Sequence, residues 1–294
     1  MKSHDHGRVV LAFDGSPCAR VAARWAAAEA GARGCPLELI HASAWPLPAL
    51  STIAPRLSEE DARRTATRHL DEGVQLCREI VDGLNVDVAL VCGDPAEALT
   101  KATAGASVLV LGASGQSATS QVMLGSVSAE VARRADCNVV VVRATQGATP
   151  RPSRPVVVGL DGSPGSDQVA RFGLDVAARQ GREVMFVHCW SDLPLPALSE
   201  LMGTAIDHER AERASRVFLV EMSGRLASES HPELTVRHVG AVDRPASALL
   251  HHAEGASLLV VGRHGRAASR EPLGSVSHAV LHYAPCPVAV VAAT

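Results

Sequence analysis

Short runs of valine and leucine alternate with longer segments that follow a helical pattern. In the first half of the chain, apolar runs predict strands over residues 8–13, 37–42, 86–91, 108–111 and 138–143. The segments between them predict helices over 19–31, 58–81, 95–104 and 126–134, with Ser58 as the N-cap of the longest one. Near-continuous apolar strands separated by helices are typical of a parallel sheet that is covered on both faces. The sequence therefore predicts a doubly wound α/β fold.

The whole pattern occurs twice, with an offset of about 150 residues. The matching segments are Val9–Pro17 and Val156–Pro164, Leu47–Leu50 and Leu195–Leu198, Leu124–Ser128 and Leu273–Ser277, and Cys137–Val142 and Cys286–Val291. So long a period indicates a duplicated domain rather than a solenoid. Glycine and prolines between the copies mark a linker. We expect a first domain over residues 1–146, a linker over 147–155 and a second domain over 156–294, each domain with a five-stranded parallel sheet and four helices.

Two loops of each copy are expected at the edge of the sheet where ligands of α/β folds bind, beyond the carboxyl ends of the strands. The loop after the first strand carries Asp14 in one copy and Asp161 in the other. The loop after the fourth strand contains Gly112, Ala113, Ser114 and Gly115, followed after nine residues by Gly125, Ser126, Val127 and Ser128. The second copy has Gly262, Arg263, His264 and Gly265, followed after eight residues by Gly274, Ser275, Val276 and Ser277.

The loop after the fourth strand has the features of a phosphate site. Gly112 and Gly115 have no Cβ, so an anion can approach their amides closely, and positive φ values cost them little. Gly125 and Ser126 precede a helix, whose N-terminus carries unpaired N–H groups and a partial positive charge. Asp14, at the end of the first strand, is placed to bind a ribose hydroxyl or a phosphate-bound Mg²⁺.

Each of these features also has a purely structural interpretation. A glycine pair after a strand often forms only a tight turn, and Gly-Ser before a helix often forms only a cap. Asp14 can equally bond its own backbone within a turn. The occurrence of all features together, at one edge of the sheet and in both copies, favours the phosphate interpretation, while both interpretations of Asp14 stay open.

Composition narrows the class of protein. The net charge of −3 and the pI of about 6.5 give no electrostatic case for nucleic acid or an anionic membrane as a partner. Seven cysteines without a CxxC pair indicate reduced thiols rather than a disulfide framework or a zinc site. The polar N-terminus has no signal-peptide pattern, and no apolar run is long enough for a membrane helix. We therefore expect a cytoplasmic location.

Several better-known sites are not supported. Neither GxxxxGK[ST] nor a GxGxxG after the first strand is present, which argues against a P-loop NTPase and a Rossmann dehydrogenase. His278 and His282 are expected to be two exposed histidines rather than metal ligands. Arg63, Arg64 and Arg68 are expected on one solvated helix face. The sequence assigns no catalytic residue and no metal site.

The spacing of the loop residues resembles the universal stress protein family, whose pattern is G-x2-G-x9-G-[S/T]. Gly112, Gly115, Gly125 and Ser126 fit this pattern, and the Asp-Gly-Ser after each first strand and the cysteine turn into each last strand are similar to the family. The resemblance covers both copies and is to the tandem type. It implies strand order 3-2-1-4-5, ATP in each domain with adenine near the ends of strands one and two, phosphates on the glycine loop, a homodimer, and a role in stress, dormancy or growth control.

The two copies depart from each other at the predicted site. The loop of copy two is one residue shorter and carries Arg263, His264, Arg266 and Arg270, where copy one has Ala113, Ser114 and Gln116. Ala12 stands where copy two has Gly159, and its methyl group is expected to crowd a nucleotide in copy one. The added positive charge in copy two argues for an anion there, so the copies are expected to differ in affinity.

The leading interpretation is that the protein binds ATP as a stress-response signal, because no general base or nucleophile is evident near the loop. A protein partner that the sequence does not identify would recognise the bound state. A slow ATPase or nucleotidyl transferase is the alternative, with Asp14 or Asp161 on Mg²⁺ and His264 as acid or base. A third interpretation is a scaffold without nucleotide that pairs its last strands with a second chain.

Overall fold

The computed structural model describes residues 7–43, 58–115, 124–144, 154–189, 208–241, 243–265 and 273–292. The chain divides into two compact units, Met1–Ala148 and Thr149–Thr294. Most of the expected linker over 147–155, the repeated segments at 47–50 and 195–198, and Gln116, Arg266 and Arg270 lie outside the described residues.

The first unit contains one parallel sheet of five strands in the order β3-β2-β1-β4-β5. The strands are β1 (Val9–Ala12), β2 (Leu37–Ser43), β3 (Val86–Cys92), β4 (Val108–Gly112) and β5 (Asn138–Val142). The described helices are α1 (Pro17–Arg33), α3 (Glu59–Ile80), α4 (Pro95–Ala102) and α5 (Ser126–Arg134). The predicted elements are confirmed, with small differences at their ends.

The second unit repeats this arrangement, with its strands in the order β8-β7-β6-β9-β10. The strands are β6 (Val156–Leu160), β7 (Val184–Cys189), β8 (Val236–Ala241), β9 (Leu258–Gly262) and β10 (Val288–Val291). The described helices are α6 (Ser166–Gln180), α8 (His208–Ser230), α9 (Pro245–Ala253) and α10 (Ser275–Tyr283). Counted within the unit, this is again the order 3-2-1-4-5.

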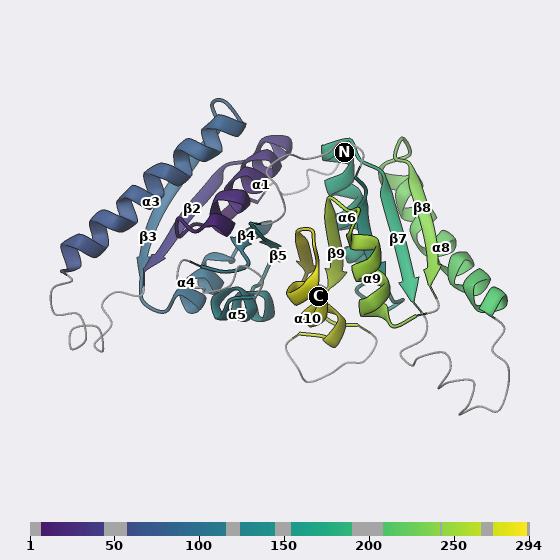
Figure 1. The fold of residues 1–294 in the computed structure, drawn as a ribbon. Helices are drawn as coiled ribbons and strands as arrows, with labels where there is room; N and C mark the ends of the chain where they lie inside the picture. Colours follow the sequence, from purple (N-terminus) through teal and green to yellow (C-terminus); the bar gives the residue numbers. More distant parts are fainter. Residues whose placement is uncertain are drawn as a thin grey trace. The chain divides into compact units, whose positions relative to one another are not determined.

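Helices cover both faces of each sheet (Figure 1). In the second unit, a Cβ on Gly173 of α6 would meet Val158 of β6, while a Cβ on the next strand residue, Gly159, would meet Leu249 of α9. Successive strand residues point to opposite faces, so α6 and α9 lie on opposite sides of the sheet. Helix α8 contacts α6, and α10 contacts α9; in the first unit the same pairs are α1 with α3 and α4 with α5.

Local sequence accounts for where the helices begin and end. Ser58 accepts a hydrogen bond from the amide of Asp61, whose side chain bonds back to Ser58, so the expected N-cap is confirmed as a capping box. Helices α1 and α6 end at Gly34 and Gly181, whose φ values of 64° and 61° are left-handed and suit glycine.

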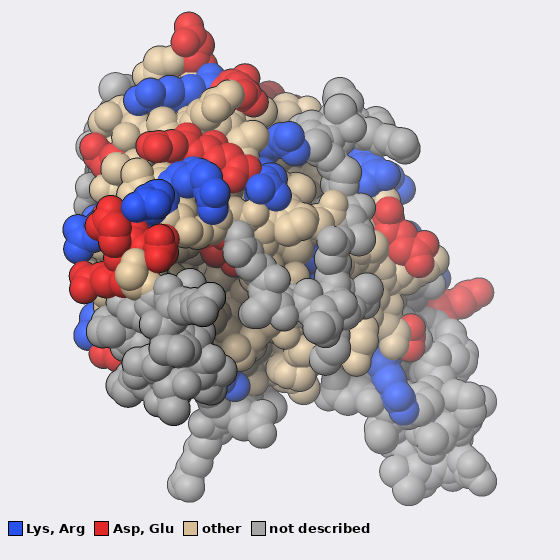
Figure 2. Space-filling model, turned by 60° about the vertical axis from the view of Figure 1, so that its left-hand side comes forward, with Lys and Arg blue, Asp and Glu red and all other residues tan. Residues whose placement is uncertain are grey.

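The surface carries charges of both signs. Arg63 and Arg64 lie within 3.6 and 3.8 Å of Glu59 and Glu60 on exposed turns of α3, as expected for a solvated helix face. Figure 2 shows positive and negative side chains interspersed on the face in view. Within the described ranges, no helix has the length and apolar character needed to cross a bilayer.

A pair of histidine rings joins β2 to α3. The ring centroids of His41 and His69 are 5.2 Å apart, and His69 is only 8% exposed. The second unit has His188 on β7 facing Phe218 on α8 at 4.6 Å, so a phenylalanine takes the place of one histidine. Copy two therefore supplies a natural replacement for His69.

Two glycines of the second unit provide a matched test of helix packing. A Cβ on Gly173 would overlap Cγ2 of the buried Val158, whereas a Cβ on Gly224 of α8 would meet no atom within 4 Å. We expect Gly173→Ala to lower the free energy of unfolding by about 1–3 kcal/mol through overpacking. Gly224→Ala should raise it by about 0.5–1 kcal/mol, because alanine is the better helix former. Urea titration measures both shifts, and a stabilising Gly173→Ala would contradict the close packing of α6 on β6.

The buried histidine makes stability depend on pH. Burial, and then the positive charges of His41 and Arg68, lower the pKa of His69, although Asp14 and Glu72 oppose the change. A histidine whose pKa is lower in the folded state is protonated more readily in the unfolded chain. Its contribution to stability is therefore complete above about pH 6.5 and is lost as the pH falls through the folded-state pKa.

Replacing His69 by phenylalanine, as in copy two, should reduce the loss of unfolding free energy between about pH 7.5 and about pH 5. Chemical denaturation at a series of pH values measures this slope. His278→Phe, the same exchange at an exposed position of α10, is the control. If the stability of His69→Phe depends on pH as strongly as that of the unsubstituted protein, His69 is not the source of the pH dependence.

Candidate functional site

The two predicted loops meet at the carboxyl edge of each sheet. Strands β1 and β4 are neighbours, and the chain leaves β1 toward β2 on the other side, so the strand order reverses between them. Oδ2 of Asp14 lies 2.7 Å from the position that a Cβ would take on Gly115. In the second unit, Oδ2 of Asp161 lies 2.5 Å from the same position on Gly265. The structure thus brings together residues about 100 positions apart in each copy.

The first oxygen of the aspartate belongs to the turn after the strand. Oδ1 of Asp14 accepts a hydrogen bond of 3.0 Å from the amide of Ser16, and Gly15 between them has a φ of 75°. Oδ1 of Asp161 accepts one of 3.0 Å from the amide of Ser163 and a second of 3.2 Å from the hydroxyl of Ser166. The turn interpretation of Asp14 is therefore confirmed for Oδ1, while Oδ2 faces the glycine loop.

The glycines of the loop allow close approach and do not use positive φ. Among the described residues, the positive φ values lie at other glycines, including Gly15 and Gly162 in the turns after β1 and β6. A Cβ on Gly112 would lie 2.8 Å from Cβ of Cys18 in α1. A Cβ on Gly125 would lie 3.3 Å from the carbonyl oxygen of Ala113. Each loop glycine thus has a neighbour within its own domain that a side chain there would contact closely.

The loop leads into a helix whose N-terminus has no side-chain cap. Gly125 and Gly274 are the N-caps of α5 and α10, and neither helix has a hydrogen bond from a capping side chain. The amide of Gly125 donates to the carbonyl of Ala113 at 2.6 Å, and that of Gly274 to Arg263 at 2.8 Å. The amides of the next residues are those that helical geometry leaves without an intrahelical acceptor. They give each domain a positively polarised group of donors beside the loop.

Three of the loop serines have buried hydroxyls. Ser128 donates to the carbonyl of Gly112 at 2.7 Å, and Ser277 to that of Gly262 at 2.6 Å, and both serines are buried. The hydroxyl of buried Ser114 lies 3.4 Å from the sulfur of Cys18. Among the predicted serines, Ser126 and Ser275 are exposed at the first position of α5 and α10.

The positions at which the two copies differ are partly exposed and partly packed against a helix. Arg263 is half-buried, while His264 and Gly265 are exposed. A Cβ on Gly159 would lie 3.0 Å from both terminal carbons of Leu249 in α9. The difference between Gly159 and Ala12 therefore has an explanation in helix packing, independent of any nucleotide.

Sequence reasoning missed a histidine beside the site in each copy. Nδ1 of His41 lies 2.8 Å from the carbonyl oxygen of Phe13, the residue before Asp14. In copy two, Nδ1 of His188 lies 2.9 Å from the hydroxyl of Ser215. The available signal was the recurrence of histidine near the end of the second strand of both copies.

Other candidate centres are not supported by the described part of the chain. It contains no group of three or more His, Cys, Asp or Glu side chains arranged to hold a metal ion. The rings of His278 and His282 lie 4.5 Å apart on α10, without a third ligand in that part. Burial raises the pKa of Cys77, Cys189 and Cys286 to about 12, which makes these thiols unreactive.

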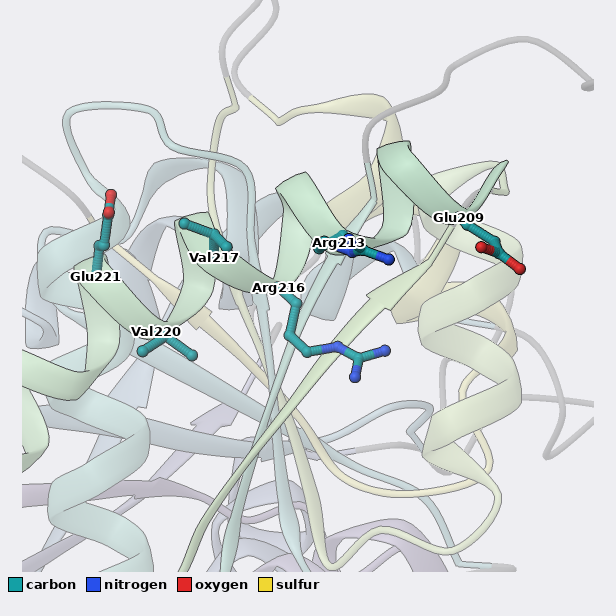
Figure 3. A pocket seen from close by; sticks show the side chains of 6 residues that line it. All are labelled: Glu209, Arg213, Arg216, Val217, Val220 and Glu221. Atoms are coloured by element: carbon teal, nitrogen blue, oxygen red, sulfur yellow. The ribbon is translucent and has the colours of Figure 1, made fainter. Parts of the chain in front are cut away.

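A hollow also lies along α8, away from the predicted residues. Its described lining consists of side chains from successive turns of this helix (Figure 3): Glu209, Arg213, Arg216, Val217, Val220 and Glu221. Val217 and Val220 are about half exposed. The described residues of this lining all belong to α8.

The sequence matches a known protein family over nearly its whole length. The universal stress protein family model matches residues 6–143 and 152–292. A universal stress protein of Mycobacterium tuberculosis is 36% identical over 297 residues, which covers 97% of this chain and 96% of the relative.

A solved structure of another universal stress protein has the same fold over the whole chain. A universal stress protein from Archaeoglobus fulgidus has a TM-score of 0.68 at 19% identity, covering 99% of this chain and 100% of its own. A universal stress protein in complex with cAMP is 28% identical, with a TM-score of 0.38, and covers 47% of this chain and 97% of its own. The family model and the curated relative together establish the assignment: the chain belongs to the universal stress protein family and carries two of its domains in tandem.

Proposed function

We propose that each domain binds an adenine nucleotide, ATP with Mg²⁺, at the carboxyl edge between its first and fourth strands. The observation that carries this proposal is the approach of an aspartate oxygen to a glycine without Cβ in both copies, beside a helix N-terminus that has no side-chain cap. Two copies with different loop lengths keep the same arrangement. A tight turn alone does not require the first-strand carboxylate to face the fourth-strand loop.

The phosphates are expected on the first turn of α5 and of α10. Amides of Ser126, Val127 and Ser128, and of Ser275, Val276 and Ser277, point out of a helix N-terminus, which favours a negative charge. The exposed hydroxyls of Ser126 and Ser275 add one donor to each group. The buried hydroxyls of Ser128 and Ser277 hold the helix start against the end of β4 or β9, which fixes the donors in place.

Asp14 and Asp161 are expected to bind the ribose or the phosphate-bound Mg²⁺ through Oδ2. Their Oδ1 atoms are occupied by the turn, so the carboxylate is already oriented before a ligand arrives. Adenine is expected near the ends of the first and second strands, where His41 and His188 lie. Bound Mg²⁺ would neutralise phosphate charge next to this carboxylate.

Occupancy of the site is proposed as the signal. A ligand that contacts both loops binds the folded state alone, and so stabilises the domain and the relative position of its loops. A partner protein or a second copy of the chain that recognises this state would bind more tightly when nucleotide is present. We propose that the protein acts in this way in the cytoplasm during stress, as a regulator rather than as an enzyme with rapid turnover.

Substitution of the second loop glycine tests the proposal directly. Gly115→Ala places a methyl group against Oδ2 of Asp14, and Gly265→Ala does so against Asp161. Displacement of the carboxylate by this methyl group would remove a charged hydrogen bond to the ligand, which corresponds to an affinity loss of about tenfold to a hundredfold at that domain's site. Calorimetric titration of the full chain with Mg·ATP should show two sites, with one of them weakened in each variant.

Gly255→Ala is the matched control, because a Cβ there would meet no atom within 4 Å and the residue lies outside the site. The thermal unfolding midpoint of each variant, measured without nucleotide, shows whether the variant has lost only the site or also the fold. Absence of ATP binding to the intact, nucleotide-free protein would refute the proposal and favour the scaffold interpretation.

A further inference from the structure

Strand β3 forms an edge of the sheet in the first domain. It pairs with β2 on its inner side, and no strand of the described residues pairs with it on its outer side. The amide of Leu37 on β2 donates to the carbonyl of Asn85, the residue before β3. Successive residues of a strand direct their N–H and C=O groups to opposite sides. The backbone groups of Val86, Val88 and Leu90 therefore point outward from the edge.

A hollow lies along this edge between β3 and α3, which contacts both β2 and β3 (Figure 1). Val74 of α3 and Val86 and Val88 of β3 give the hollow an apolar lining. Asp71 and Arg78 also line it, about two turns apart on α3. The side chain of Val88 is in a strand and yet 53% exposed. Outward-facing backbone groups beside exposed valines are the features that let a sheet edge accept another strand.

The second domain has a different residue at the corresponding edge position. Val88 is the third residue of β3, and His238 is the third residue of β8. Nε2 of His238 lies 2.8 Å from the hydroxyl of Ser223 on α8, and its ring stacks on Phe186 with centroids 6.0 Å apart. Copy two thus has a side chain here that interacts with its own helix and sheet. The exposed valine at the edge is therefore specific to the first domain.

The charges beside the hollow are complementary to those of a second copy. A Cβ on Gly73 would meet Leu39, which is in register with Val88, so this part of α3 is level with Val88. Asp71 and Arg78 lie on either side of that level. A second copy that runs antiparallel about a two-fold axis at Val88 would place its Arg78 opposite Asp71 and its Asp71 opposite Arg78. Within the described part of the chain, neither residue already has an ion pair.

The same axis also suits the backbone of the strand. Because the N–H and C=O groups of Val88 point outward, Val88 would form a hydrogen-bonded pair with Val88 of the second copy, and Val86 would form one with Leu90 of that copy. An axis at Asp87 would instead place two carboxylates directly opposite each other, which is unfavourable. One register therefore satisfies the backbone groups, the valines and the charges together.

We propose that two copies of this chain associate through their β3 edges, antiparallel about a two-fold axis at Val88. The sheet of one first domain then continues into that of the other, and the two α3 helices lie on the same face with Val74 near the axis. Each contact occurs twice, because the same surface is used by both copies. This inference goes beyond the proposed function, since β2 separates the β3 edge from β1 and the association needs no nucleotide.

Sedimentation equilibrium of the full chain without nucleotide measures the dissociation constant of the dimer. Val88→Lys places two ammonium groups at the axis and should raise this constant by at least about tenfold. Val220→Lys is the matched control, because Val220 on α8 is 50% exposed and lies in the second domain. The thermal unfolding midpoint of each variant shows whether the fold is kept.

Reversal of the charges tests the register of the two copies. Asp71→Arg and Arg78→Asp each replace two attractions by two repulsions, and each should raise the dissociation constant by about threefold to tenfold. The double variant Asp71→Arg/Arg78→Asp restores opposite charges across the axis, so its dissociation constant should return to within about twofold of the original. Such a recovery does not follow from an effect on the fold of a single chain.

Three results would overturn the proposal. The first is an intact chain that stays monomeric up to about 100 μM. The second is a dimer that Val88→Lys weakens no more than Val220→Lys does, which would assign the contact to another surface, such as the last strands. The third is a double variant that associates no better than its two single variants. If Val88→Lys lowers the thermal midpoint, the charge variants on exposed positions of α3 decide the question alone.

Discussion

The site depends on one close approach, that of a first-strand carboxylate to a glycine of the fourth-strand loop. Asp14 and Asp161 each have one oxygen fixed by the turn that follows the strand, which leaves the other directed at Gly115 or Gly265. Any side chain at those glycines would occupy the space of the carboxylate. A residue with a Cβ at these positions would have to displace the carboxylate from the place it has in the structure.

Close packing at the loop glycines concerns more than the contact with the aspartate. Gly112 and Gly125 are also closely packed, against Cys18 and against the carbonyl of Ala113. These contacts give the two glycines a packing role that is independent of the phosphate binding proposed for the loop. The structural and the functional interpretations of the pattern do not compete at these positions.

Much of the fold could be predicted from the sequence because it depends on local patterns and on duplication. The helix over 126–134 and the N-cap at Ser58 follow from neighbouring residues, and strand order followed from the family resemblance. The direction of the Ser128 hydroxyl could not be predicted in this way, because it depends on where β4 ends relative to α5. The ring pair of His41 and His69 also needed the register of α3 on β2, which the pattern of either element alone does not contain.

At two places the copies keep a feature while the residue that supplies it changes. A ring faces the second-strand histidine from the long helix in both domains, but it is His69 in one and Phe218 in the other. An arginine stands at the junction of the last two strand ends in both, but it is Arg143 in one and Arg263 in the other. Each domain therefore completes the packing of its second strand against its long helix from its own sequence.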